Sequence, residues 1–544
     1  MSRLGDYHSL ITVQTTVQSN SLRSELRERS SAALSETRNY DGCIFDKVKI
    51  YDYYPLQLLI LGRSNIRQHS SRQSCWLIIS GIVYDVTNFV DSHPGGASLI
   101  LKYAGKDATQ AYEPLHASDT LEKHLSDDQR LGSLVEDDFG LPSHGAAQTT
   151  FSKSVTTDNG VGEISTAVAR QRCPRLSSMI SLADFAQAAK AKLSATSYAF
   201  LSSGAEDNVS LDRNLTSWRV VRLRPRILRP MPKPPNIQRR ILGNDFSVPF
   251  VICPAGGAKL CHPEGDTLLT KAAFQQGALQ WVCNNAGRTQ KAVAAARGPG
   301  QILYWQIYAM KDLKVTEDEI RSAIALGFKG FALTVDAIWA GKRELDLRAR
   351  LAEDDDDHED THGDVQDQSF MMAPKVNRPP VYTEFTFDTA ITWLKSLTDL
   401  PIVIKGVQTW EDALLCHQYG VHPWLSNHGG RQLDSTPSGL ETLLDIHEHC
   451  PVVLRECQVL VDGGVTRGAD VVKALALGCR AVGIGRGFLY SMVFGLRGIE
   501  KAMEILKHEI ETTLALLGVM SLDELGPQHV SDPQLCKTFG PSEL

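Results

Sequence analysis

The sequence predicts an α/β protein in which a (β/α)8 barrel, the TIM-barrel architecture, follows a small α+β domain. Three observations predict this fold class. Strand-like and helical patterns alternate eight times within residues 177–520, and polar side chains collect at the ends of those strands. Residues 71–135 instead carry short strands and two histidine-bearing turns. The rest of the chain divides into a leader (1–70), a linker (136–176) and a C-terminal tail (521–544).

The composition is that of an ordinary globular protein. The chain has 544 residues, of which 42% are hydrophobic and 22% charged, enough for roughly two to four domains. The net charge of −7 gives no indication of a nucleic-acid partner or of binding to an anionic membrane. Eleven cysteines without a CxxC pair indicate reduced thiols, not a disulfide framework or a zinc site. The apolar run at 55–61 is too short to span a membrane.

The composition of the N-terminal leader indicates a disordered segment and not a targeting sequence. Its first 40 residues are rich in Ser, Thr and Arg, but acidic residues such as Asp6, Glu25 and Glu28 stand among them. Because transit peptides avoid acids, a mitochondrial presequence is the less favoured interpretation. We therefore predict a cytoplasmic location, with the mitochondrial intermembrane space as the alternative. Residues 41–70 contain tyrosines and leucines typical of a core, without an assigned partner.

The small domain presents two histidines on turns. The runs 76–79 and 82–86 are strand-like, and a Pro-Gly-Gly sequence breaks the chain directly after His93. A helix is expected over 97–104, and a second turn carries His116. Two imidazoles from opposite sides can bind an iron whose six positions are then full, which suits electron transfer and not oxygen binding. The alternative is a pair of unliganded surface histidines.

The spacing of these features resembles cytochrome b5. The resemblance rests on Trp76, the Val-Tyr-Asp-Val strand, the His-Pro-Gly-Gly turn at His93, and His116. It implies a b-type haem whose iron is bound by His93 and His116.

Two polar segments are predicted to be irregular. Residues 136–176 are rich in Ser, Thr, Gly and Ala and show no helical or strand period, which indicates either a tether that lets the haem domain swing or a plain spacer. Residues 351–372 contain an acidic run at 353–360, whose charge density predicts disorder. This second segment is either a mobile loop over the site or a solvated insertion.

The barrel is predicted from eight strand-like runs separated by helical patterns such as 407–419 and 467–477. A further amphipathic helix begins near Ser181. In such barrels the chemistry lies at the C-terminal ends of the strands. The predicted strands are 248–254, 279–283, 302–308, 330–336, 401–407, 424–428, 459–462 and 481–485.

The most informative stretch is Ser-Asn-His-Gly-Gly-Arg-Gln-Leu-Asp at 426–434. It places the imidazole of His428 at the tip of a strand and the guanidinium of Arg431 three residues away. Two glycines between them allow a sharp turn or the close approach of a flat ligand. A base beside a two-pronged cation suits a substrate with an abstractable proton and a carboxylate. A histidine in an ordinary glycine turn is the alternative.

The last two strands end in glycines that can form a phosphate cradle. They read Asp-Gly-Gly at 462–464 and Gly-Ile-Gly-Arg-Gly at 483–487, at the strands where barrels usually bind phosphate. The second sequence lacks the third glycine and the downstream acid of a dinucleotide fingerprint. A mononucleotide is therefore favoured over NAD.

These motifs together resemble the FMN-dependent α-hydroxy-acid oxidases and dehydrogenases. The matching stretches are 305–308, 334–337, 401–406, 426–434 and the Asp-Gly-Gly sequence. With the b5-like domain in front, residues 71–520 resemble the flavocytochrome b2 family of L-lactate dehydrogenases. The resemblance implies FMN and haem b as cofactors, an L-2-hydroxy acid as substrate, a cytochrome c-like electron acceptor, and a homo-oligomer, expected to be a tetramer.

The resemblance also implies roles at the substrate end of the site. His428 would remove a proton from the α-carbon or its hydroxyl, and Asp336 would pair with the resulting imidazolium. Arg431, helped by Arg343, would hold the substrate carboxylate. Tyr308 would hydrogen-bond to the developing oxyanion or to the hydroxyl.

Other matched residues are implied to hold FMN. Lys405 would lie against the flavin and stabilise negative charge on the reduced ring. Gln306 and Thr334 would bond to the polar edge of the ring. The phosphate cradle would be formed by Asp462, Gly463, Gly464, Gly485 and Arg486.

Three departures from the family pattern concern the substrate more than the flavin. Phe200 stands where the family usually has a tyrosine that helps to bind the substrate carboxylate, and we count Phe200 among the substrate-binding residues. Cys283, Asn284 and Asn285 replace small hydroxylated residues, and Thr466 replaces an arginine. An oxidase acting on a bulkier acid, or a barrel that has lost activity and serves as an electron carrier or interaction protein, are therefore the alternatives.

Overall fold

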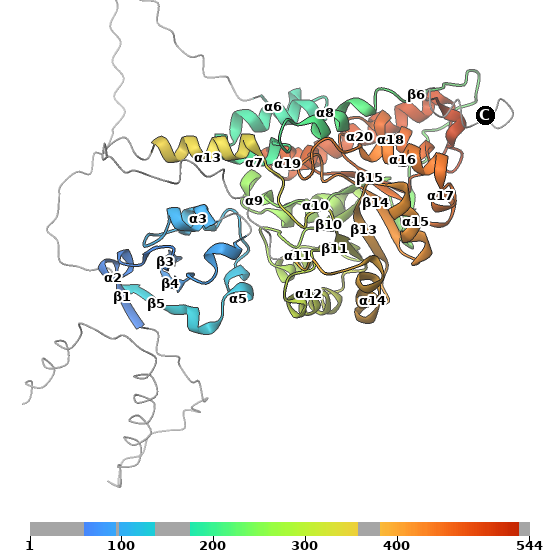
Figure 1. Ribbon diagram of the computed structural model, residues 1–544. Coiled ribbons are helices and arrows are strands. Elements are labelled where there is room, and N and C mark those ends of the chain that lie inside the picture. Colours follow the sequence, from blue (N-terminus) through green and yellow to red (C-terminus); the bar gives the residue numbers. More distant parts are fainter. Residues whose placement is uncertain (1–58, 94–96, 136–173, 357–380, 532–544) are drawn as a thin grey trace, which may run out of the picture. The chain divides into compact units, whose positions relative to one another are not determined.

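The computed structural model describes residues 59–93, 97–135, 174–356 and 381–531 (Figure 1). The predicted linker up to residue 173 and most of the predicted leader lie outside these ranges, as do residues 94–96, 357–380 and 532–544. Within the described ranges, no helix combines the length and apolar character that crossing a membrane requires.

The first described domain is a mixed five-stranded sheet with short helices, in the order β1-β5-β4-β3-β2. Its central hairpin turns at Ser80 and Gly81, both at positive φ (51° and 76°), as a two-residue hairpin requires. The α+β prediction is confirmed. The elements are β1 (Leu59–Gly62), α2 (Arg63–Arg67), β2 (Ser70–Ser71), β3 (Ser74–Ile79), β4 (Ile82–Asp85), η1 (Val90–Ser92), α3 (Ala97–Lys102), α4 (Thr109–Tyr112), α5 (Thr120–His124), η2 (Asp127–Gln129) and β5 (Arg130–Val135).

The predicted boundary at residue 71 is too late. Strand β1 pairs in parallel with β5, and Ile66 of α2 is fully buried against Ile78 and Val83. Residues 59–70 therefore belong to this domain and not to a leader. A four-residue edge strand and a five-residue helix are too short for either period to show in the sequence.

The second domain is a closed barrel of eight parallel strands, which confirms the predicted fold. Figure 1 shows the strands ringed by helices. Every predicted strand is present; seven are shortened by up to two residues at an end, and the strand predicted at 424–428 instead spans His422–Leu425. The strands are β9 (Phe250–Ile252), β10 (Leu279–Val282), β11 (Leu303–Ile307), β12 (Phe331–Thr334), β13 (Ile402–Val407), β14 (His422–Leu425), β15 (Leu460–Asp462) and β16 (Ala481–Ile484).

Helices cover the outside of the barrel and its entrance. The largest buried cluster lies between strands and helices, while Trp281, Tyr304 and Trp424 fill the barrel interior. The helices are η3 (Leu176–Ser178), α6 (Leu182–Lys192), α7 (Ala195–Ser202), α8 (Val209–Ser217), α9 (Ala258–Cys261), α10 (Asp266–Gln276), α11 (Gln290–Ala295), α12 (Leu313–Ala325), α13 (Glu344–Asp356), α14 (Phe387–Leu397), α15 (Trp410–Gln418), α16 (Gly439–His449), α17 (Val452–Glu456), α18 (Gly468–Ala476), α19 (Arg486–Ser491), η5 (Met492–Phe494), α20 (Leu496–Leu517) and η6 (Pro527–His529).

Two further boundaries need correction. Strand β17 (Val530–Ser531) pairs with β6 (Arg222–Leu223), so residues 521–531 are part of the barrel domain and not of a separate tail. A hairpin of β7 (Arg239–Ile241) and β8 (Asn244–Phe246) precedes the first barrel strand. The start of the acidic run, predicted to be disordered, is instead the last turn of α13, which ends at Asp356.

Candidate active site and haem site

The predicted base lies in a loop that begins directly after β14. Nδ1 of His428 is 2.9 Å from Oδ1 of Asp336, which follows β12. The Asp336 side chain is 1% exposed and that of His428 26%. Burial alone would raise the pKa of Asp336, but the charge and hydrogen bond of His428, together with Lys405, lower it. An ionised Asp336 therefore accepts from Nδ1, which leaves Nε2 free to take a proton.

The backbone of this loop is left-handed at three consecutive residues. His428, Gly429 and Gly430 have φ values of 58°, 68° and 74°. A β-carbon on Gly430 would lie 2.5 Å from the backbone nitrogen of Leu211, and one on Gly429 would lie 2.9 Å from the guanidinium of Arg486. The glycines thus serve the sharp turn and the close approach of α8 and Arg486.

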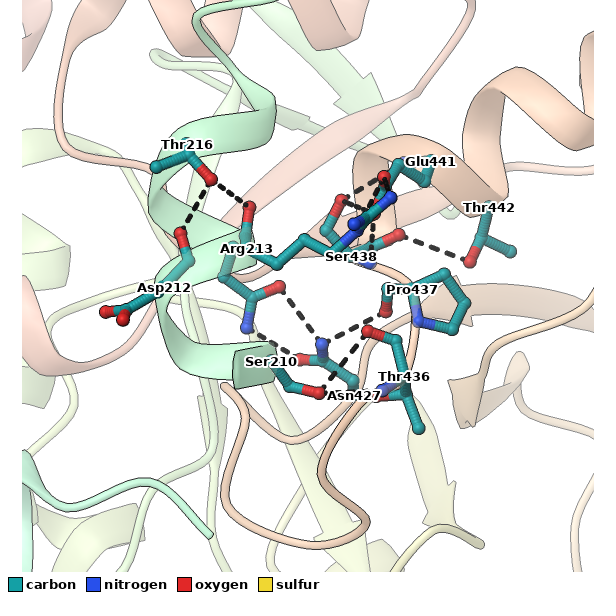
Figure 2. A network of polar contacts seen from close by, with 11 residues as sticks. Ser210, Asp212, Arg213, Thr216, Asn427, Thr436, Pro437, Ser438, Glu441 and Thr442 are labelled. Carbon is teal, nitrogen blue, oxygen red and sulfur yellow. Dashed lines mark hydrogen bonds and ion pairs between the residues drawn. The ribbon is translucent and has the colours of Figure 1, made fainter. Parts of the chain in front are cut away.

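A polar network between α8 and α16 supports the loop that carries His428 (Figure 2). The side-chain amides of Asn214 and Asn427 bond to each other in both directions, at 2.8 and 3.1 Å. Asn427 also donates to the carbonyl of Pro437 and accepts from the backbone N–H of Gly430. Neither asparagine was assigned a role from the sequence, because a contact between residues 213 positions apart leaves no local pattern.

Two guanidiniums converge on Phe200. Those of Arg431 and Arg343 lie 5.4 and 5.7 Å from the centre of its ring. Arg431 donates to the carbonyls of Leu201 and Ser203, which fixes it at the end of α7. Burial and the neighbouring Arg343 and Arg486 hold the pKa of Arg431 well below its usual range, so the site favours an anionic ligand.

Tyr308 follows β11 and lines the same cavity as the two arginines and His428. Burial, with the nearby Cys283 and Asp336, raises the pKa of its phenol well above the ordinary value. The phenol therefore stays protonated and can donate a hydrogen bond.

Lys405 of β13 is a buried cation that contacts a hydroxyl and a carboxylate. Its Nζ donates to Oγ of Ser426 at 3.0 Å and lies 3.5 Å from Oδ2 of Asp462. Burial would lower the pKa of Lys405, but the charges of Asp462 and Asp336 raise it. The ammonium therefore stays charged inside the barrel mouth. Asp462 contacts this lysine, a partner that the sequence did not suggest.

The remaining predicted cofactor residues fall into two groups. Gln306 donates to the hydroxyl of Thr334 at 2.9 Å, and both side chains are buried at neighbouring strand ends. Gly463, Gly464, Gly485 and Arg486 line the cavity that also contains Lys405. Arg486 donates to the carbonyl of Gly429 at 2.7 Å. A guanidinium and a buried ammonium in one cavity fit a flavin mononucleotide, whose phosphate and reduced ring are both anionic.

The predicted haem ligands face each other. The ring centres of His93 and His116 are 6.0 Å apart. Imidazole nitrogens bind metals at about 2 Å, so two rings on opposite sides of an iron have centres about 6 Å apart. Nδ1 of His116 lies 3.0 Å from the carbonyl of Tyr112, whose ring stacks on the imidazole. This bond leaves Nε2 of His116 as the metal ligand. The pair therefore fits a haem iron.

Comparison with known families assigns both domains. A family model described as FMN-dependent dehydrogenase matches residues 189–532. A model described as the cytochrome b5-like haem/steroid binding domain matches residues 63–135.

Individual relatives match most of the chain. The chain is 36% identical to L-lactate dehydrogenase (cytochrome) of Wickerhamomyces anomalus and 34% identical to that of Saccharomyces cerevisiae, in each case over 85% of this chain and 78% of the relative. Among solved structures, the recombinant flavin-binding domain of baker's yeast flavocytochrome b2 superposes with a TM-score of 0.60 at 34% identity, covering 68% of this chain and 91% of that domain.

Proposed function

The chain belongs to the FMN-dependent dehydrogenases and carries a cytochrome b5-like domain before the barrel, and from this premise we propose that its substrate is L-lactate or a larger L-2-hydroxy acid. The enzyme oxidises an L-2-hydroxy acid to the 2-oxo acid through FMN and haem. When bound, FMN supplies a two-electron acceptor and haem b a one-electron carrier. The proposed final acceptor is a cytochrome c-like protein, and the proposed assembly is a homotetramer.

The observation that carries the proposal is the convergence of base and cations in one cavity. Arg431 and Arg343 would hold the carboxylate, which turns the α-carbon and its hydroxyl toward His428. His428 would take a proton at Nε2, and the buried Asp336 would stabilise the imidazolium. Tyr308 would donate to the substrate oxygen, while Lys405 would balance the charge of the reduced ring.

The lining of the cavity near Phe200 favours a substrate whose side chain is larger than the methyl group of lactate. A β-carbon on Gly256 would meet no atom nearer than 3.6 Å, so the fold itself does not require glycine there. Gly256, Asn285 and Phe200 line the cavity together with Arg343. A glycine in the same cavity as an apolar ring leaves room for an aliphatic or aromatic group.

Steady-state kinetics with two acceptors test the proposal. We expect L-2-hydroxy acids to reduce cytochrome c faster than they drive oxygen uptake, and larger apolar acids to give a higher kcat/KM than L-lactate. Oxygen uptake without cytochrome c reduction would support the oxidase alternative. An enzyme with bound flavin that none of the acids reduces would support the inactive alternative.

A further inference from the structure

A serine hydroxyl connects the lysine and the base loop. Ser426 is the first residue after β14 and is 0% exposed. It lies between Lys405 on β13 and Asp462 at the end of β15, the strands on either side of β14.

All three hydrogen-bonding positions of this hydroxyl are used. Oγ of Ser426 donates to Oδ1 of Asp462 at 2.7 Å. It accepts from Nζ of Lys405 at 3.0 Å and from the backbone N–H of His428 at 3.1 Å. A hydroxyl has one proton and two lone pairs, so the set is complete. Because Lys405 can only donate and an ionised Asp462 can only accept, the orientation of the hydroxyl is fixed.

The same contacts stabilise the buried ion pair of Lys405 and Asp462 and the left-handed backbone of His428. Lys405 and Asp462 are only 4% and 6% exposed, and a buried ion pair is favourable only when its remaining hydrogen bonds are satisfied. Asp462 also accepts from the thiol of Cys253, at 3.7 Å. His428 has a left-handed backbone, which is strained for a residue other than glycine. Its N–H is held by Ser426 and its ring by Asp336.

We propose that Ser426 is a positioning residue that aims the ammonium of Lys405 at the flavin and ties it to the loop of His428. The inference rests on the proposed placement of Lys405 against the flavin. Without the hydroxyl, Lys405 keeps Asp462 as its counter-ion but loses its nearest acceptor. The ammonium is then held by the longer contact alone, and negative charge on the flavin is less well stabilised.

Sulfite is a probe of this effect that needs no substrate. It adds to oxidised flavin, forming one bond and leaving the ring with a negative charge, so its affinity reports the stabilisation of that charge. A hydrogen bond to a charged group is stronger than one between neutral groups, so its loss should be measurable in the charge stabilisation at the flavin. Ser426→Ala should therefore bind sulfite about 10-fold more weakly. The same change lowers the two-electron midpoint potential of the flavin by about 30 mV.

A matched control is Ser491→Ala. Ser491 is also 0% exposed, but its hydroxyl donates only to the carbonyl of Phe488 within a helix. It should leave sulfite affinity and midpoint potential unchanged. In Ser426→Ala, kcat should fall while KM for the hydroxy acid stays within about twofold, since Arg431 holds the carboxylate.

Sulfite affinity and midpoint potential of Ser426→Ala equal to those of the wild type would overturn the proposal. If Ser426→Ala does not retain FMN, Ser426→Cys replaces it, because a thiol nearly keeps the shape but is a weak donor and acceptor. That variant should also bind sulfite more weakly, and unchanged affinity would again contradict us. A wild type that binds sulfite but oxidises no hydroxy acid would refute the proposed function alone.

Discussion

At the scale of single residues, Phe200 is the departure from the family pattern that we expect to affect how the substrate carboxylate is held. The centre of its ring lies 5.7 and 5.4 Å from the guanidiniums of Arg343 and Arg431, and a phenyl ring cannot donate a hydrogen bond to a carboxylate. The family resemblance suggested a tyrosine at this place, and the structure puts Phe200 beside both arginines. Because an apolar ring cannot bond to a carboxylate, we expect the two guanidiniums to bind the carboxylate without its help.

Phe200→Tyr should lower the KM for L-lactate. A phenol bonded to a carboxylate contributes about 1.5–3 kcal/mol, which corresponds to about 10- to 100-fold in affinity. Since the base and Lys405 are untouched, kcat should stay within a few-fold. Steady-state kinetics with L-lactate measure both. Unchanged affinity would show that residue 200 does not face the carboxylate.

The buried carboxyl group of Asp266 should make the stability of the protein depend on pH. It begins α10, is 2% exposed and accepts from the backbone N–H of Gly287. Burial raises its pKa from 3.8 to about 7. The folded state therefore holds the proton more tightly than the unfolded state. The resulting stabilisation is present at low pH and is lost as the pH rises from about 4 through about 7.

Asp266→Asn should remove this dependence. The amide keeps an acceptor for Gly287 and cannot ionise. The free energy of unfolding of the variant should therefore rise relative to that of the wild type as the pH increases from 5 to 8. A shift of about three units corresponds to at most about 4 kcal/mol. Thermal unfolding at several pH values measures the difference, with the exposed Asp318→Asn as control. A difference that is constant or falls with pH would contradict the assignment.

At the scale of elements, the loop after β15 depends on how closely α8 approaches it. A β-carbon on Gly464 would lie 1.8 Å from the backbone carbonyl oxygen of Asn214. Gly464 and Gly300 have nearly the same φ, 72° and 70°, but a β-carbon on Gly300 would meet nothing within 4 Å. Comparing alanine substitutions at these two glycines therefore separates the effect of backbone strain from that of steric crowding.

Gly464→Ala should be much the more damaging of these two substitutions. Gly300→Ala costs only the strain of a left-handed residue, about 1–2 kcal/mol. Gly464→Ala must also displace α8, whose Asn214 supports the catalytic loop, so we expect several kcal/mol of destabilisation and weaker FMN binding. Urea unfolding and flavin titration measure the two effects. Equal losses in the two variants would show that α8 does not press on this loop.

The sequence predicted elements well where they are long or repeated. All eight barrel strands were found, because a buried parallel strand is a continuous apolar run and recurs with each helix. The short elements β1, α2 and β17 were missed, since their places depend on pairing with distant segments. The pair of His428 and Asp336 was predicted from the family motif. The contacts of Ser426 and Asn214 were not, because nothing local marks them.

At the scale of the whole molecule, the predicted haem ligands and the predicted flavin site belong to two different domains. His93 and His116 come from the small domain, and every predicted flavin residue comes from the barrel. His93→Ala or His116→Ala should therefore abolish the six-coordinate haem spectrum and leave reduction of the flavin by substrate intact. Absorbance spectra and flavin content measure both. Loss of FMN in either variant would contradict this modular arrangement. The tetramer, the acceptor and the cytoplasmic location stay predictions.

The central claim is that electrons pass from an L-2-hydroxy acid to the flavin and then to the haem within one chain. Anaerobic stopped-flow absorbance after mixing with L-lactate or a larger L-2-hydroxy acid tests it most directly. We predict that the flavin band bleaches first and that the reduced-haem band then rises at a rate independent of protein concentration. A flavin that bleaches while the haem stays oxidised, or haem reduction that precedes flavin reduction, would contradict the claim.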